Sequence, residues 1–458
     1  MIADNLFDRI VTTDRLLAAT GGEAWITAML DAEVALAKAE ADTGVIPHEA
    51  AKAIESASRP KDFDVATIAR AARLGGNPVI PLVEMLRAKV ASAGKDWVHW
   101  GATSQDILDT AAVLVSRRSG RMILEDLARL ASGCASMADE HRGSLMTART
   151  LLQPALPTTF GAKAAGWLFA TTESRAMLAT SLENLPAQLG GAGGTLASLG
   201  SQGLAVAEAY STRLGLKVPP MPWHAVRIPL VALSSALAIA AGTSAKISGD
   251  VALLMQAEVA EVSEPAAPGR GASSTLPHKR NPVGAAAVGA AARRCAALAG
   301  SMFESLSGEH ERSLVAWPVE WQTLGDLLAL AGGAVARSAE TVNGLEVDVK
   351  AMNANLAARA GALLSENVSL ALTGRLGREA SRAAVARALA ASPDGSSGSV
   401  AAALLADPVV AAASTPDEVG DLLDPGGYLG SVAVWIDRVL SAAADSTAQD
   451  ERGVQWGR

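Results

Sequence analysis

The densest group of side chains capable of chemistry lies in the segment Glu264–Pro282, EPAAPGRGASSTLPHKRNP. Prolines and glycines at its start disfavour a helix there, and we expect a helix to begin near Pro282. Its donors fall within nine positions: Ser273, Ser274, His278, Lys279, Arg280 and Asn281. A loop rich in donors at the start of a helix is typical of an anion clamp that closes over its ligand. The segment therefore predicts a binding site for an anion.

Histidines are few, and four of the six lie in polar clusters. Besides His278, these are His99 in WVHWGATSQD, His224 in PWHAVR and His310 in EHER. A single histidine is usually a hydrogen-bonded, half-buried side chain, but the repeated company of arginines favours a role in binding an anion. Paired spacings such as HxxxH or HExxH are missing from the sequence, so we expect no metal ion.

Composition excludes several classes of protein. The net charge of −8 argues against a nucleic-acid binder. Two cysteines without a CxxC spacing disfavour a disulfide scaffold. The uncharged stretch Ile228–Ala245 reaches the minimum length of a membrane span, but it contains serines and is bounded by Arg227 and Lys246, which favours a buried bundle helix. We expect a soluble cytoplasmic protein with no membrane partner.

Helical periodicity dominates the chain, and many of its apolar residues are alanine, which lets helices pack closely. We expect an all-α fold with an N-terminal helical domain at 1–105, a central bundle of long helices at 106–347 and a small helical domain at 348–458. The expected helices are Trp25–Thr43, Pro78–Ser92, Thr103–Glu140, Thr158–Asn184, Arg227–Val262, Pro282–Leu306 and Val319–Ala339. The glycine-rich segment Leu189–Gly203 lacks the ending of a P-loop, so it is either an ordinary connection or a loop whose N–H groups face an anionic substrate.

Four segments, in chain order, resemble signature regions of the fumarase/aspartase superfamily. HWGATSQD at 99–106 is similar to HYGxTSxD, RTLLQPALPTTFG at 149–161 to GRTHxxxAxPTTFG, and GAGGT at 191–195 to GAVGT. The segment 272–282 is similar to GSSxMPxKxNP, with Ala272 and Leu276 as departures. The resemblance implies three helical domains, a homotetramer with a twenty-helix core, active sites shared by three subunits, and no metal or organic cofactor.

The resemblance also implies a reaction: removal of a proton next to a carboxylate and expulsion of a group from the neighbouring carbon. By family position, Ser273 is the expected proton-transfer residue, provided that backbone N–H groups stabilise its alkoxide. The other expected catalytic residues are Ser274, Lys279, His99 and His141. For substrate binding we expect Thr103, Ser104, Arg149, Gln153, Arg227, Arg280, Asn281 and Arg312. A structural salt bridge is the alternative for Arg149 and Arg280.

Two departures from the lyase motifs limit which reaction we expect. Lyases similar to adenylosuccinate lyase carry histidines where this chain has Leu151 and Asn77. The set of motifs is instead similar to the bacterial cycloisomerases of the superfamily, which close a lactone on a tricarboxylate. The attacking carboxylate is already ionised and belongs to the substrate, so no acid at 151 is needed. A lyase releasing fumarate from adenylosuccinate or argininosuccinate, and a catalytically silent structural member, are the alternatives.

Overall fold

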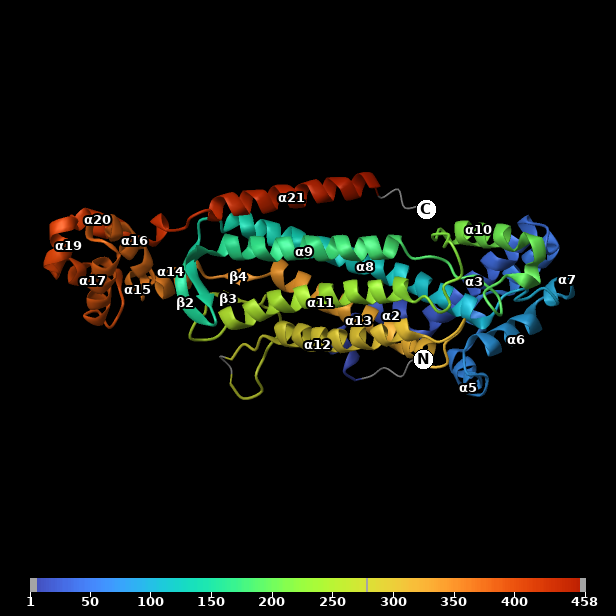
Figure 1. The fold of residues 1–458 in the computed structure, drawn as a ribbon. Coiled ribbons are helices and arrows are strands. Elements are labelled where there is room, and N and C mark those ends of the chain that lie inside the picture. The colour runs from blue at the N-terminus through green and yellow to red at the C-terminus, as the bar shows by residue number, and fades with distance from the viewer. Residues whose placement is uncertain (1–5, 277–278, 454–458) are drawn as a thin grey trace.

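The computed structural model describes residues 6–276 and 279–453. Figure 1 shows an elongated molecule in which long helices run side by side through the middle and smaller helices gather at both ends. The bundle consists of α8 (Ser104–Glu140), α9 (Phe160–Glu183), α11 (Ile228–Leu254), α12 (Val283–Phe303) and α13 (Ala316–Asn343). The predicted all-α class and the long helices of the bundle are confirmed.

Small residues allow the N-terminal segment to lie directly on the bundle. Helices α1 (Asp8–Val11) and α2 (Asp14–Thr20) lie against α13. A Cβ atom on Gly333 would lie 2.1 Å from the carbonyl oxygen of Val11, and one on Gly332 would lie 2.5 Å from Leu16. Only glycine permits this approach. The small residues of α13 therefore allow the N-terminal segment to pack closely against it.

One end of the bundle carries the N-terminal helices (Figure 1). There α8 begins and α3 packs against it, next to α10. The predicted helices in this region are confirmed within a few residues. The elements are α3 (Gly22–Asp42), α4 (His48–Ala57), η1 (Pro60–Asp62), α5 (Val65–Gly75), α6 (Val79–Lys89), α7 (Ser92–Lys95), η2 (Ala197–Gln202) and α10 (Gly203–Leu214). We call this end the α3 end.

The opposite end carries two short antiparallel strand pairs, which the sequence analysis missed. Strand β1 (Leu145–Thr150) forms a hairpin with β2 (Gln153–Thr159), and β3 (Val262–Ser263) pairs with β4 (Glu346–Val347). Pro154 and Pro157 lie within β2, where they prevent an earlier start of α9. Helix α11 ends at Leu254, sooner than expected; Ala260 farther on takes a left-handed φ of 50° before the chain enters β3. We call this end the hairpin end.

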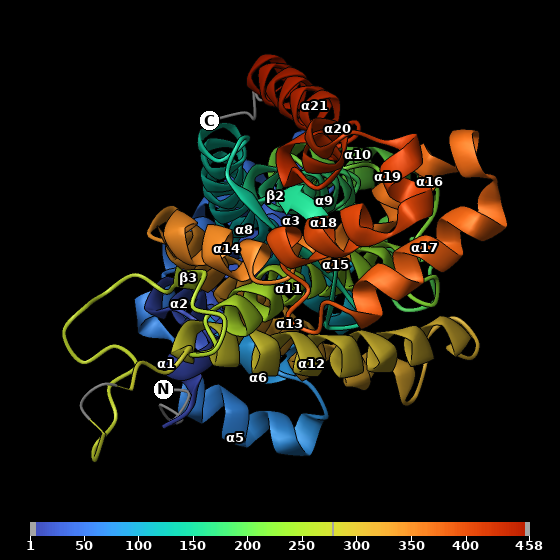
Figure 2. The same cartoon turned by 90° about the vertical axis from the view of Figure 1, so that its left-hand side faces the viewer.

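Beyond the hairpin end, short helices with a hydrophobic core of their own form a separate group. Figure 2 looks toward this group and shows the loop between β3 and α12 extending away from the bundle. The last helix, α21, leaves the group and returns along α9. The remaining elements are η3 (Glu304–Ser307), α14 (Val349–Ala357), α15 (Ala360–Leu363), α16 (Ser365–Leu376), α17 (Arg378–Ala390), α18 (Ser397–Ala406), α19 (Pro408–Ala413), α20 (Pro416–Leu422), η4 (Pro425–Gly427) and α21 (Val432–Gly453).

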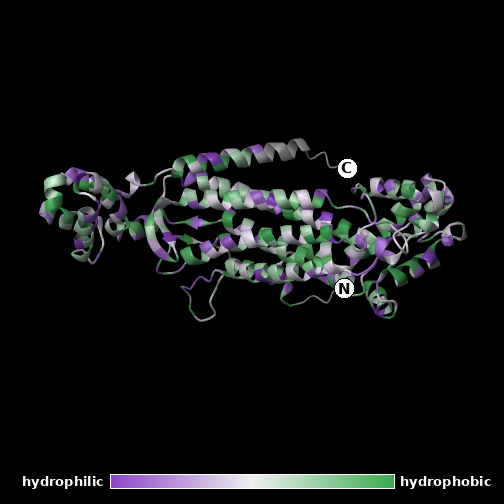
Figure 3. Cartoon of the chain, viewed as in Figure 1, coloured by the Kyte–Doolittle hydropathy of each residue, from purple (hydrophilic) through white to green (hydrophobic). Residues whose placement is uncertain are grey.

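Helix α11 is predominantly apolar, with Lys246 and Asp250 as its charged residues. Among the described residues it alone is long and apolar enough to cross a membrane, and half of its most apolar window is buried in the chain. It packs against α9, α12 and α13 as a bundle helix (Figure 3). Large apolar side chains nevertheless remain exposed on α9 and α11, namely Phe169, Met177, Ile239 and Leu253. A helix that is apolar over most of its surface is normally covered, so this surface lacks a partner within one chain.

Candidate active site

The predicted site residues fall into two groups at opposite ends of the bundle. The α3 end holds His99, Thr103, Ser104, Arg227 and Arg312, and the hairpin end holds His141, Arg149, Gln153, Ser273, Ser274, Lys279, Arg280 and Asn281. Helix α11 connects the two ends, and its 27 residues span about 40 Å at 1.5 Å per residue. A small tricarboxylate cannot touch both groups of one chain.

At the α3 end, the buried carboxylate of Asp106 joins three of the predicted segments. It accepts hydrogen bonds from the backbone N–H groups of Thr103, Gly190 and Gly191 at 2.9, 2.8 and 2.9 Å. Nε2 of His224 lies 2.7 Å from the same carboxylate. Asp106 therefore holds the start of α8, the glycine-rich bend and the PWH segment together. It belongs to the motif TSxD, which was the available signal, but the sequence analysis did not assign it to the site.

Arg312 reaches this same junction from the loop before α13. Its Nε donates to Oε1 of Gln105 at 2.9 Å, and Nη2 donates to the carbonyl of Ala192 at 3.2 Å. Gln105 in turn donates to the carbonyl of His224 at 3.0 Å. These bonds use carbonyl and amide acceptors only, so the positive charge of Arg312 is not neutralised by them. The structure thus brings Arg312 together with Thr103 and the bend at 190–192.

The environment of Arg227 does not fit our expectation that this residue pairs with a substrate carboxylate. The side chain is buried and forms ion pairs with Asp109, at 2.7 Å, and with Glu320. Its guanidinium also lies over the ring of Trp223, 4.7 Å from the centroid. Two carboxylates accept hydrogen bonds from its donors, and an aromatic ring covers one face of the guanidinium. Arg227 therefore stabilises the interior of the α3 end and is not exposed to a ligand.

The signature loop at the hairpin end is closed at its neck by Gly271 and Asn281. The carbonyl of Gly271 accepts from the backbone N–H of Asn281 at 2.9 Å and from its side-chain amide at 3.1 Å. A Cβ atom on Gly271, whose φ is +65°, would lie 2.5 Å from the carbonyl oxygen of Asn281. Glycine is therefore required at this neck, and Asn281 has a structural role in the loop.

Ser273 receives two backbone hydrogen bonds within the loop. Its Oγ accepts hydrogen bonds from the backbone N–H groups of Leu276 and Thr275 at 3.1 and 3.4 Å. Two N–H donors stabilise a negative charge on the oxygen, as in an oxyanion hole. Ser274 and Lys279 are exposed beside it. His278 lies outside the described residues.

The base of the loop is anchored on α12. The buried carboxylate of Glu264 accepts from the backbone N–H groups of Gly284 and Ala285 at 3.1 and 2.8 Å. Arg280 donates to the carbonyl of Glu264 at 2.8 Å and forms an exposed ion pair with Glu346 at 3.3 Å. The first turn of α12 is thus occupied by a carboxylate of the chain itself, and Arg280 is partly engaged.

The β1–β2 hairpin presents the second signature region. Arg149 forms a two-pronged ion pair with the buried Glu261, with contacts of 2.9 and 2.6 Å, which is the structural alternative considered above. Gln153 is exposed near the tip. Leu151 and Leu152 form the two-residue tip with φ values of 51° and 65°, and they are 97% and 69% exposed. Two positive φ values indicate a type I′ turn, for which leucine is an unfavourable residue.

Two further groups complete the hairpin end. His141 ends α8, with Nδ1 3.1 Å from Oγ of Ser144, and its ring packs edge-on against Phe160. Lys163, on the first turn of α9, was not predicted. Burial lowers the pKa of the Lys163 ammonium, with the cations of Lys246 and Arg149 acting in the same direction and Asp250 opposing them. Its position two residues after PTTFG was the only signal in the sequence.

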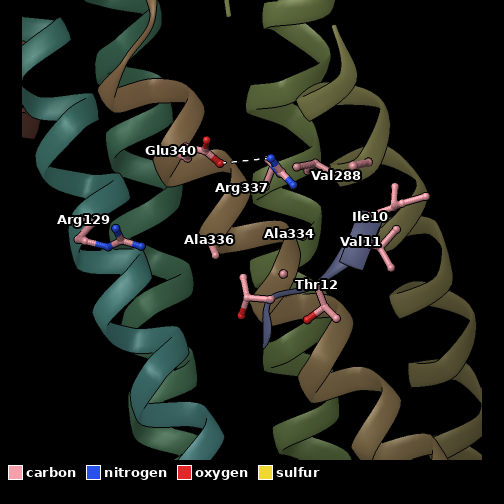
Figure 4. Close-up of a pocket in the computed structure, with 12 residues that line it drawn as sticks. Ile10, Val11, Thr12, Arg129, Val288, Ala334, Ala336, Arg337 and Glu340 are labelled. Atoms are coloured by element: carbon pink, nitrogen blue, oxygen red, sulfur yellow. Dashed lines mark hydrogen bonds and ion pairs between the residues drawn. The ribbon is translucent and has the colours of Figure 1, made fainter. Parts of the chain in front are cut away.

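One cavity formed by described residues lies apart from these groups. Figure 4 shows a cavity of about 280 Å³ between the N-terminal segment, α8, α12 and α13. There Arg337 points toward Glu340, its ion-pair partner at 3.3 Å, and Arg129 comes from the neighbouring α8. The cavity contains none of the predicted site residues. The described site residues thus form two separate surfaces, one at each end of the bundle.

Comparison with known families supplies the decisive observation. A family model described as Lyase matches residues 8–296, and one described as Adenylosuccinate lyase C-terminus matches residues 361–439. The chain belongs to the Lyase family. The resemblance to the fumarase/aspartase superfamily is thereby confirmed, and the two surfaces described above are the motif regions of a Lyase-family member.

Individual members of the family are similar over nearly the whole chain. A 3-carboxy-cis,cis-muconate cycloisomerase of Pseudomonas aeruginosa is 42% identical over 443 residues, which cover 96% of each chain. A nitrosuccinate lyase of Streptomyces davaonensis is 43% identical over 434 residues, covering 92% of this chain and 91% of the relative. The crystal structure of a 3-carboxy-cis,cis-muconate lactonizing enzyme from Pseudomonas putida is 39% identical, with a TM-score of 0.90, and covers 96% of this chain and 99% of the other.

Proposed function

We propose that the protein is a cycloisomerase that interconverts 3-carboxy-cis,cis-muconate and 4-carboxymuconolactone, a step of protocatechuate breakdown in the β-ketoadipate pathway. The observation that carries the proposal is Leu151. This residue stands where amine-releasing lyases keep a proton-donating histidine, and a leucine side chain cannot transfer a proton. The reaction must therefore be one whose leaving group departs as a stable anion.

Lactone opening and closing meet this requirement. In the opening direction, Oγ of Ser273, as an alkoxide held by the N–H groups of Leu276 and Thr275, removes a proton from the carbon next to a carboxylate. The electron pair forms the alkene, and the ring C–O bond breaks with release of a carboxylate. In the closing direction, that carboxylate adds to the alkene and Ser273 returns the proton to carbon. Atoms and electrons balance without a redox cofactor.

The active site is proposed to form between copies of the chain in a homotetramer. The two groups of site residues lie about 40 Å apart along the bundle, and large apolar side chains of α9 and α11 are exposed between them. Antiparallel packing of copies along these helices covers the apolar surface and places the α3 end of one copy beside the hairpin end of another. The assembly would work as a soluble cytoplasmic enzyme on a free tricarboxylate.

Nitrosuccinate lyase activity is the second candidate. The relative from Streptomyces davaonensis supports it, with an identity equal to that of the cycloisomerases. Nitrite is a weakly basic anion, so its expulsion from nitrosuccinate needs no proton donor at position 151 either. The chemistry argued from Leu151 thus covers both candidates, and the substrate must separate them.

A three-substrate assay tests the proposal. Purified protein is added to 3-carboxy-cis,cis-muconate, to nitrosuccinate and to adenylosuccinate in separate reactions. We expect loss of the muconate absorbance with a kcat/KM at least a hundredfold above that for the other two substrates. Release of nitrite and fumarate as the faster reaction would establish the second candidate. Preferred release of fumarate from adenylosuccinate would overturn the argument from Leu151.

A further inference from the structure

His99 is held in an unfavourable backbone conformation at the α3 end. Its φ is +62°, in the left-handed region, which costs a residue with a side chain about 1–2 kcal/mol. Gly101, two residues on, also has a positive φ, and a Cβ atom there would lie 2.5 Å from Leu199. The segment is thus fixed by its surroundings, and strain of this kind persists where a side chain must point in one direction.

The direction of the His99 ring is set by Glu33 on α3. Nδ1 of His99 lies 2.6 Å from Oε1 of Glu33, whose side chain is only 1% exposed. A carboxylate at Nδ1 keeps a proton on that nitrogen and leaves Nε2 for a ligand. Within the described residues, the contact with Glu33 is the one hydrogen bond of the His99 ring, and the side chain is 16% exposed.

The charges around the ring favour its protonated form. Burial lowers the pKa of His99, but the carboxylates of Glu33 and Asp106 raise it and Arg87 opposes them, with a net shift upward. Arg87 is on α6 and donates to the carbonyl of Val98 at 3.2 Å. Helices α3, α8 and α6 therefore each place one charged group near His99. The two carboxylates raise its pKa by more than the single cation lowers it.

Local cations matter here because the protein is acidic and its proposed substrate carries three carboxylates. Of the five arginine and lysine residues expected to meet the substrate, Arg227 and Arg149 are neutralised by carboxylates of the chain. At the α3 end this leaves Arg312 as the available arginine among the predicted residues. His99 is placed to supply a second cation at this end.

We propose that Glu33 is a positioning residue that holds His99 as an imidazolium, so that its Nε2–H binds a substrate carboxylate. The inference deepens the proposed function and rests on it for the identity of the ligand. Glu33 itself does not touch the substrate. Its negative charge stabilises the charge on His99, and its hydrogen bond directs the ring.

The variant Glu33→Gln tests the charge without removing the hydrogen bond, because the amide oxygen can still accept from Nδ1. A matched control lies on the same helix. Glu40 is also a buried carboxyl, and neither of its oxygens has a hydrogen-bond partner among the described residues. Burial and the neighbouring Glu33 raise the pKa of Glu40 to about 9, so it is uncharged at pH 7. Glu40→Gln therefore leaves the charge around His99 unchanged at neutral pH.

The first measurement is independent of any substrate. Hydrogen–deuterium exchange at the histidine Cε1 position, followed by mass spectrometry across pH, gives a titration midpoint for each histidine of the full-length protein. We expect the midpoint of His99 to lie above about 6.5, the value of an unperturbed histidine, to fall by about one pH unit in Glu33→Gln, and to stay in place in Glu40→Gln. An unchanged His99 midpoint in Glu33→Gln would overturn the proposal.

The second measurement uses the reaction itself. We expect Glu33→Gln to raise KM about tenfold at pH 7.5, which corresponds to one pKa unit, with kcat changed less than threefold, and Glu33→Asp to restore part of the loss. A KM that is the same in wild type and Glu33→Gln at every pH would also overturn the proposal. If the wild type turns over none of the three substrates, the proposed function fails, while the exchange experiment still decides whether Glu33 controls the charge of His99.

Discussion

Nε2 of His224 lies 2.7 Å from the carboxylate of Asp106, and both side chains are buried where three segments of the candidate site meet. Asp106 also accepts from the backbone of Thr103, Gly190 and Gly191. The position of the glycine-rich bend relative to α8 thus depends on one carboxylate. A neutral side chain of the same shape cannot accept all four bonds.

We expect Asp106→Asn to lower kcat/KM at least a hundredfold and the free energy of unfolding by about 2–4 kcal/mol, because buried donors lose their acceptor. Steady-state kinetics and urea unfolding measure the two effects. Asp31→Asn is the control, since Asp31 forms an exposed ion pair with Arg118, and it should change stability by less than about 1 kcal/mol. Equal behaviour of the two variants would contradict the role given to Asp106.

Ser273→Ala should lower kcat by about a thousandfold with little change in the melting temperature. The loop around Ser273 is largely exposed, so its hydroxyl contributes little to folding, whereas the alkoxide held by two N–H groups is the proposed base. Ser274→Ala, the neighbouring control, should lose less than tenfold. A larger loss of kcat in Ser274→Ala than in Ser273→Ala would make Ser274 the base in place of Ser273.

Two inactive variants should restore activity together if the site forms between copies. We expect light scattering to give four times the 46.6 kDa mass of the chain. His99→Ala changes the α3 end and Ser273→Ala the hairpin end. Unfolding and refolding them as a mixture should yield mixed assemblies that contain some intact sites, whereas each variant refolded alone stays inactive. A mixture as inactive as its components would contradict a site shared between copies.

Glu40 should make the protein less stable as pH rises. The folded chain keeps the Glu40 proton up to a pKa of about 9, whereas the unfolded chain loses it near 4.5. The unfolded state therefore gains stability relative to the folded state between these values. Glu40→Gln should be more stable than wild type by on the order of 1–3 kcal/mol at pH 8, with the difference vanishing near pH 4.5. Urea unfolding across pH measures it, and a constant difference would contradict the assignment.

The leucines at the hairpin tip should lower the stability of the protein and raise its activity. Replacing Leu151 and Leu152 by Asn-Gly supplies the residues that a type I′ turn prefers and should stabilise the chain by about 1–2 kcal/mol. In the proposed assembly the apolar tip would exclude water from a site on another copy, so the same change should lower kcat/KM. Leu370→Asn, which removes an exposed leucine on α16, should leave kcat/KM unchanged. Full activity of the tip variant would show that the leucines do not face substrate.

Much of the architecture could be predicted from local pattern. The helical periodicity of 104–140 predicted α8 because period and length are properties of consecutive residues. The β1–β2 hairpin was missed because RTLLQPALPTT contains no glycine or asparagine at its turn, and two leucines adopt the left-handed conformation instead. The motif was recognised from its residues, but the hairpin conformation of its backbone was not predicted. Turn propensities favour glycine or asparagine at such a turn, not leucine.

By itself, the sequence determined the class of helical bundle, the signature loop around Ser273, and the presence of leucine at position 151. These follow from residue types at short spacing. Only the tertiary structure decided that Arg227 is neutralised by Asp109 and Glu320, that Glu33 stands behind His99, and that the site residues lie at opposite ends of the bundle. Such contacts join residues 66 to 118 positions apart, and no local spacing encodes which distant helix will bring a carboxylate to a given cation.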